Sequence, residues 1–255
     1  MPKGVYACAS AMLTESRALD VAAQNLANAQ SSGYRKASPL RGTFAEYLAE
    51  REGRRGDLKG DGGAGVYQEG VYRSFTDGQR HETGGTFDLA LRGDAFWQVR
   101  SPEGRLLLTR ASSYTTDTAN RLVDPNGCLL EGQGGPVTIP PDAERISVDQ
   151  QGRIYAYIPG EGGARFSFID QIRVGAVEAP GRLQAVNGQY FDPAGQEVRD
   201  AEGYEVRQGF VEESNVDPVG ELVHLITIQR RYEAAQKAMR TQFETGGDYT
   251  QILAR

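Results

Sequence analysis

"NLANAQSSGYRKA", residues 25–37, closes a long run of small and apolar residues with two serines, a glycine and a tyrosine. Glycine adopts left-handed backbone angles easily, so Gly33 is where a helix terminator is expected. Upstream, apolar residues recur every seven positions: Val5, Met12, Leu19 and Leu26. This spacing predicts an amphipathic helix of about 24 residues with a narrow apolar face within residues 3–30.

A second helix is predicted in the last part of the chain. Asp217 can cap its start, and Pro218 suits its first position because an N–H group is not needed there. Its apolar face is thin, and the polar residues Gln229 and Gln236 lie in the same row as the apolar ones: Leu222, Leu225, Ile226, Tyr232 and Met239. Gly246 and Gly247 predict a break, followed by a separate short turn of helix.

Between the two helices the pattern changes to alternating apolar and polar residues. Stretches such as "TFDLALRGDAFWQVRS" and "ERISVDQQGRIYAYI" are separated by turns such as "PEG" and "DPNG", which is typical of short strands. Before them, "REGRRGDLKGDGGAG" carries charge and glycine without periodicity. The expected divisions are an N-terminal helical segment, a flexible connector, an all-β domain and a C-terminal helical segment: 1–35, 36–66, 67–211 and 212–255.

Neither apolar helix face can be covered by a helix adjacent in sequence. We therefore expect an α+β fold in which the N- and C-terminal helices pair as an elongated α-helical hairpin or coiled coil, with the all-β domain inserted between them. Because both faces are thin, we expect the two helices to be largely disordered in the isolated chain. They would become helical when many copies pack together.

Composition excludes several functional classes. The formal net charge of -6 and the pI of about 5.2 argue against a nucleic-acid partner. No apolar run reaches the ~18 residues of a membrane span. The start "MPKGVYACASAMLTESRALD" is interrupted too early by polar residues to be a secretory signal peptide.

No constellation of residues predicts catalysis, a metal site or a cofactor. "GDGGAG" at 60–65 lacks the strand and helix that a dinucleotide site requires, and is interpreted as linker. The remaining candidates are explained more simply. His81 is expected to be solvated, His224 to pack partly buried in the C-terminal helix, and Asp88 and Asp94 to cap turns. The two cysteines, Cys8 and Cys128, fit neither a disulfide framework nor a metal site. At least one of Phe96 and Trp97 is expected in the core.

Taken in order, three blocks resemble the bacterial flagellar basal-body rod proteins. "AAQNLANAQSSGYRK" is similar to the family's N-terminal signature, and "GGTFDLALRGDAFWQVRSPEGRLLLTRASSYTTDTANRLVDPNGCLLEG" to its central block. "QGFVEESNVDPVGELVHLITIQRRYEAAQKAM" is similar to its C-terminal block. With the resemblance we assign residues of the N-terminal signature to subunit contacts, beside the apolar helix residues named above: Asn25, Asn28, Gly33 and Tyr34.

The resemblance implies a structural subunit without catalysis. Such proteins are exported through the flagellar type III apparatus without a cleaved signal peptide. They polymerise helically with copies of themselves, other rod subunits and hook–basal-body neighbours, and form the drive shaft across the periplasm without membrane insertion. "GQGGPVTIPPDAERISVDQQGRIYA" and "ESNVDPV" resemble the proximal rod subunit, whereas "QRRYEAAQK" resembles the distal one. Proximal rod is favoured. The alternatives are the distal rod, another axial protein, or a β-domain binding module or hydrolase with helical tails.

Overall fold

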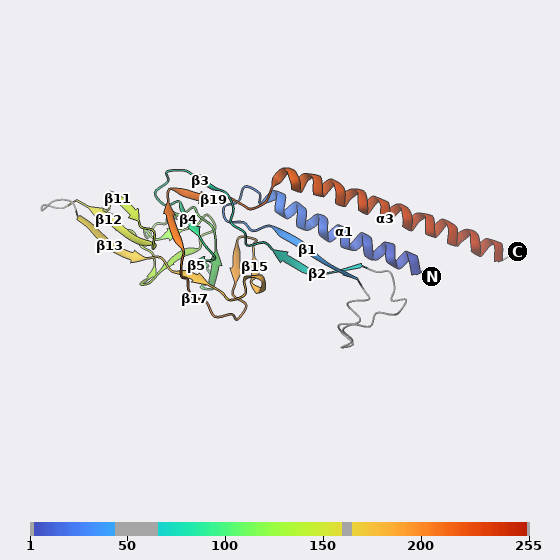
Figure 1. The fold of residues 1–255 in the computed structure, drawn as a ribbon, viewed down its shortest axis with the longest axis horizontal. Coiled ribbons are helices and arrows are strands. Elements are labelled where there is room, and N and C mark those ends of the chain that lie inside the picture. Colours follow the sequence, from blue (N-terminus) through green and yellow to red (C-terminus); the bar gives the residue numbers. More distant parts are fainter. Residues whose placement is uncertain (1–2, 44–65, 160–164, 254–255) are drawn as a thin grey trace. The chain divides into compact units, whose positions relative to one another are not determined.

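The computed structural model describes residues 3–43, 66–159 and 165–253, which form two compact units (Figure 1). The first, called here the helical unit, contains two long helices and a β-hairpin. The second, called the β unit, comprises residues 28–36 and 75–216. Two helices and a β-rich middle confirm the predicted α+β class.

The two helices of the helical unit are α1 (Lys3–Ala27) and α3 (Pro218–Leu253). They lie side by side and run in opposite directions (Figure 1). The start of α3 is as predicted: Pro218 is its first residue, and the Asp217 carboxylate accepts a hydrogen bond from the Val219 N–H at 3.1 Å. Local signals were sufficient here, because a cap and a proline act on the residues next to them.

The predicted break at Gly246 and Gly247 is wrong, because α3 continues through both glycines to Leu253. A glycine within a helix costs about 1 kcal/mol relative to alanine, which weakens a helix without forbidding it. In the part of the chain that the structure describes, no helix combines the length and hydrophobicity that a membrane span needs.

The hairpin of the helical unit pairs β1 (Ala37–Thr43) with β2 (Val66–Arg73) antiparallel. Both strands contact α1: the Thr14 hydroxyl donates to the Val66 carbonyl at 3.3 Å, and Arg41 forms an ion pair with Glu15 at 2.9 Å. The expected connector over 36–66 therefore begins as a strand, which local composition did not indicate because "ASPLRGT" has no alternation of apolar and polar residues. Residues 44–65, the greater part of that connector, lie outside the described residues.

The β unit consists of short antiparallel strands. The described residues include a ten-stranded sheet with the path β15-β16-β6-β5-β9-β8-β7, a three-stranded sheet β11-β12-β13, and the pairs β18-β4 and β19-β3. The remaining strands β10, β14 and β17 pair beside that path, and one short 3-10 turn is η1 (Pro180–Arg182). The strand bounds are β3 Arg80–Glu82, β4 Leu89–Arg92, β5 Phe96–Arg100, β6 Leu106–Thr109, β7 Thr115–Thr116, β8 Leu122–Val123, β9 Leu129–Gly132, β10 Gly135–Pro136, β11 Arg145–Val148, β12 Arg153–Ile158, β13 Arg165–Gln171, β14 Val174–Ala176, β15 Gln184–Val186, β16 Tyr190–Asp192, β17 Arg199–Asp200, β18 Glu205–Gln208 and β19 Phe210–Glu212.

The core of the β unit is apolar and aromatic. Trp97 is fully buried in its main cluster, and Phe96 points into a second cluster with Leu108 and Phe191. The rings of Phe96 and Phe191 meet edge to face at 6.1 Å. The prediction that at least one of Phe96 and Trp97 is core is confirmed, since the alternation of a strand sends neighbouring side chains to opposite faces and both faces of β5 are covered here.

Candidate functional site

The face of α1 that contacts α3 is made of small residues. Ala18 and Ala22 are buried with Ile228 of α3 in one cluster, and nearer the start of α1 a Cβ atom at Gly4 would lie 2.4 Å from the side-chain amide of Gln242. Such small residues let two helix backbones approach closely. Gly4 and Ala18 each lie one position before a residue of the predicted apolar row, which corresponds to a rotation of about 100° around the helix.

The predicted α1 row lies at the edge of that contact. Val5, Met12, Leu19 and Leu26 are all half-buried, and Leu19 packs against the buried cluster. On the outer face, Tyr6 and Leu13 are exposed. The sequence therefore predicts the heptad spacing of α1. It does not predict which face of α1 contacts α3, because alanine contributes little to a hydrophobic pattern.

The apolar residues of α3 divide between two faces. Leu225, Tyr232 and Met239 are half-buried, and Leu225 packs against the cluster of Ala18, Ala22 and Ile228, whereas Gln229 is exposed. Four apolar residues at the start of α3 face away, and we call them the α3 stripe: Val219, Leu222, Val223 and Ile226, which are 71%, 48%, 61% and 52% exposed. Their i, i+3, i+4, i+7 spacing forms one continuous strip, and an exposed apolar strip of this kind marks an interaction surface.

Asn25 of the "NLAN" signature is buried within the helical unit. Its side-chain amide donates to the Ala37 carbonyl at 2.8 Å and to Glu221 at 3.0 Å, and its amide oxygen accepts from the Ala37 N–H at 2.9 Å. One side chain thus joins the end of α1, the start of β1 and the first turn of α3. This places Asn25 inside the chain, in contrast to the expected subunit contact.

Asn28, Gly33 and Tyr34 follow in the β unit. The half-buried Asn28 accepts a hydrogen bond from the Ser31 hydroxyl at 3.2 Å. Gly33 has φ +68°, its N–H donates to the Glu212 carbonyl at 2.9 Å, and a Cβ atom there would lie 2.2 Å from the backbone of Arg110. Only glycine fits this position. Because Gly33 and Tyr34 are buried, their contacts are internal as well.

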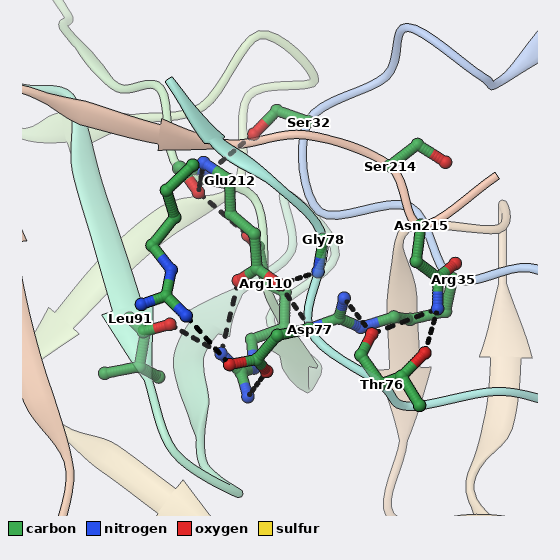
Figure 2. A network of polar contacts seen from close by, with 12 residues as sticks. Ser32, Arg35, Thr76, Asp77, Gly78, Leu91, Arg110, Glu212, Ser214 and Asn215 are labelled. Atoms are coloured by element: carbon green, nitrogen blue, oxygen red, sulfur yellow. Dashed lines mark hydrogen bonds and ion pairs between the residues drawn. The ribbon is translucent and has the colours of Figure 1, made fainter. Parts of the chain in front are cut away.

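The segments that lead to and from the helices meet at a buried cluster of charges (Figure 2). Arg35 donates to one oxygen of Glu212 at 2.7 Å and Arg110 to the other at 3.2 Å, and these side chains are almost completely buried. The Gly78 N–H also donates to Glu212, at 3.1 Å. Arg110 further donates to the carbonyls of Leu91 and Gly93. Burial lowers the pKa of Arg110, which the charge of Glu212 partly offsets.

Asn215 of the "SNV" motif completes this arrangement (Figure 2). Its amide oxygen accepts from the Lys36 N–H at 2.7 Å, and its amide nitrogen donates to the Thr76 carbonyl at 3.0 Å. Arg35 donates to the same carbonyl at 3.0 Å. Residues near 35, 76 and 215 are therefore fastened to one another within the β unit. The ion pair of Arg35 and Glu212 could not be predicted, because 177 positions separate the two residues and neither lies in a characteristic local pattern.

The residues considered for chemistry are dispersed. His81 and His224 are both exposed, so the expected partly buried packing role of His224 is wrong. The Asp88 carboxylate accepts a hydrogen bond from the Thr83 hydroxyl at 2.5 Å, and Asp94 is exposed. Cys8 is half-buried and Cys128 is buried, both as free thiols. Within the described residues, no three His, Cys, Asp or Glu side chains are grouped to hold a metal ion.

Comparisons with known proteins agree with this architecture. Residues 207–251 match the family "Flagellar basal body rod FlgEFG protein C-terminal", and residues 90–156 match "Flagellar hook protein FlgE/F/G D1 domain". The flagellar basal-body rod protein FlgF of Caulobacter vibrioides is 32% identical over 100% of this chain and 99% of its own length. FlgG of Agrobacterium fabrum is 29% identical over 92% and 94%, and FlgF of Mesorhizobium japonicum 29% over 94% and 93%.

The chain belongs to the flagellar basal-body rod protein family, a family of structural proteins and not of enzymes. It is a structural subunit of the bacterial flagellar rod, located in the basal body, where it assembles with other rod or hook components.

Proposed function

We propose that this subunit polymerises helically through α1 and α3, which pair as an α-helical hairpin and form the wall of the drive shaft across the periplasm. The α3 stripe carries this proposal. Four adjacent branched side chains are largely exposed in the single chain, and a neighbouring helix would remove them from water. We keep the predicted contact residues that are not buried inside the chain: Val5, Met12, Leu19, Leu26, Asn28, Leu222, Leu225, Ile226, Gln229, Tyr232 and Met239.

We further propose that the two helices gain most of their stability on assembly. Among the residues whose side chains the structure describes, the fully buried apolar contact between α1 and α3 consists of Ala18, Ala22 and Ile228, which is little for two helices of 25 and 36 residues. This chain would be exported unfolded through the flagellar type III apparatus without a cleaved signal peptide. Delayed helix formation would keep copies from polymerising before they reach the rod.

Circular dichroism of the purified chain tests the delayed formation of the helices. The dilute monomer is expected to give a strand-dominated spectrum, and the assembled form is expected to gain helical signal at 222 nm, because helices with few internal contacts are marginal alone. A variant lacking residues 1–27, which belong to the helical unit, serves as the control for the contribution of α1 to the helical signal. Equal helix content per chain in the monomer and the polymer would contradict coupled folding.

We propose the proximal rod as the position of the subunit, on the resemblance of "GQGGPVTIPPDAERISVDQQGRIYA" and "ESNVDPV" to proximal subunits. The alternative, the distal rod, rests on "QRRYEAAQK". Electron microscopy of isolated basal bodies that carry a label on this chain separates the two. Label at the inner-membrane end of the rod is expected, and label only in the upper rod would contradict the proximal position.

A further inference from the structure

A second row of residues with heptad spacing runs along α1 and is exposed at every position. We call it the α1 outer row: Tyr6, Ala9, Leu13, Ser16, Asp20, Ala23 and Ala27. Its alternating steps of three and four residues are those of a coiled-coil contact. Asp20 stands two positions from both Ala18 and Ala22, a rotation of about 200° around the helix. The α1 outer row therefore lies on the side of α1 opposite the contact with α3.

The far side of α3 carries a row with the same spacing, which begins with residues of the α3 stripe. We call it the α3 outer row, and all its members are exposed: Val219, Val223, Ile226, Arg230, Glu233, Lys237, Arg240 and Glu244. Ile226 stands two positions before the buried Ile228, so this row faces away from α1. The two outer rows thus lie on opposite sides of the helix pair. Copies can stand side by side with little rotation between them, α3 of one copy against α1 of the next, which is a heterologous contact that continues without closing into a dimer.

The charges on the two outer sides complement each other. On α1, the exposed Arg17 and Asp20 are three residues apart, and on α3 the exposed Arg230 and Glu233 are also three residues apart. None of the four has an ion-pair partner among the residues that the structure describes. Because α1 and α3 run in opposite directions, Asp20 can face Arg230 of a neighbour while Arg17 faces Glu233.

This pairing sets the position of the neighbour along the helix axis. Within one chain, α1 and α3 meet at Asn25 and Glu221. Each step back along α1 corresponds to one step forward along α3, so Asp20 is level with Ile226 of its own chain. A shift of four residues, about 6 Å along the axis, brings Asp20 of the neighbour level with Arg230.

The same position of the neighbour also covers the α3 stripe. Val223 then lies over Ala27, a small residue that lets the two helices approach closely. Arg240 and Glu244 are a second pair of opposite charges on the α3 outer row. Facing them with the charges of α1 would carry the stripe past Ala27, the last residue of α1, and leave it uncovered. One position of the neighbour therefore satisfies both the charges and the apolar residues.

We propose that the α3 outer row of one copy packs on the α1 outer row of a second copy, with Arg230 on Asp20 and Val223 over Ala27. This inference rests on the proposed helical assembly. It adds to that assembly the surface that receives the α3 stripe and the register of the contact.

Engineered disulfides in the intact rod test this register. Ala27→Cys and Val223→Cys are introduced together into a chain whose two native cysteines are replaced by serine, and isolated basal bodies are oxidised. The expected product is a ladder of dimers, trimers and longer species on a non-reducing gel, because each copy bonds through a different position to each of its two neighbours.

The pair Ala9→Cys and Val223→Cys is the matched control and is expected to give about 10-fold less product. Ala9 lies about 27 Å from Ala27 along α1, whereas a disulfide needs Cα atoms within about 7 Å of each other. Dimers without longer species, bonds to another protein alone, or equal yields from the two pairs would overturn the inference.

Charge reversal tests the contact without cysteines, and so also covers a cysteine variant that fails to enter basal bodies. Asp20→Arg is expected to lower the number of rods per cell about 5-fold, because like charges then face each other. Arg230→Asp is expected to act similarly, and the double variant to restore most of the rods. Asp142→Arg, which reverses an exposed acid in the β unit, is the matched control. An equal loss in this control, or no recovery in the double variant, rules out the pairing.

These tests are separate from the test of the proposed assembly. Rods that form normally but give no ladder from positions 27 and 223 refute only the register. A helix variant, Leu225→Asp, that still forms rods refutes the assembly through the helices, whatever the disulfides show.

Discussion

Glu212→Ala is expected to lower the free energy of unfolding of the β unit by about 3–5 kcal/mol, the range found when one partner of a buried ion pair is removed. The alanine leaves Arg35 and Arg110 without their shared carboxylate in a region where both are almost completely buried. The Gly78 N–H loses its acceptor at the same time. The single tryptophan, Trp97, is buried in the same unit, so its fluorescence during denaturation by urea reports the change.

The neighbouring residue provides the matched control for this variant. Glu213 carries the same charge, is exposed, and forms no ion pair among the described residues, so Glu213→Ala is expected to change stability by less than about 0.5 kcal/mol. Replacing all three charged residues by apolar ones of similar size, as Arg35→Met, Arg110→Met and Glu212→Leu, is expected to recover much of the loss. Equal stability of the Glu212→Ala and Glu213→Ala variants would show that the cluster does not hold the β unit together.

Leu225→Asp is expected to abolish rod assembly and motility. Leu225 packs against Ala18, Ala22 and Ile228, so an aspartate there places a charge in an apolar contact, at a cost of several kcal/mol. Leu26→Asp is expected to act in the same way from α1. In both variants the β unit stays folded, because these residues belong to the helical unit. Electron microscopy of basal bodies and a swimming assay measure the loss.

Leu225→Met is the control, since it keeps an apolar side chain of similar volume and is expected to assemble normally. An unchanged Trp97 fluorescence transition in Leu225→Asp would show that the β unit is intact. Normal rods from the Leu225→Asp chain would mean that this face of α3 has no part in assembly.

Features that depend on neighbouring residues could be predicted from the sequence. Asp217 and Pro218 fix the start of α3, and the alternation around Trp97 indicates a buried strand. The phase of the α1 contact could not be predicted, because Ala18 and Ala22 matter through their small size and not through hydrophobicity. At Gly246 and Gly247, helix propensity was too weak a signal to place an end of α3.

Contacts between segments that are distant in the sequence could not be predicted from local patterns. The strand β1 is held by its pairing with β2, which begins at Val66, and "ASPLRGT" alone does not indicate a strand. Arg35, Arg110 and Glu212 are ordinary charged residues in the sequence, and only the fold gives them one buried site. Asn25 and Gly33 were predicted as subunit contacts, whereas in the structure both make hydrogen bonds within the chain.

The fastening of residues near 35, 76 and 215 has a mechanical consequence for a rotating shaft. The chain passes between its two units at 27–28, 36–37, 74–75 and 216–217, and Asn215 links segments that adjoin three of these crossings. A force on any one of these three connections is therefore shared with the other two before it reaches the strands of the β unit. Torque would load these three connections together, and none of the three would have to bear the full strain alone.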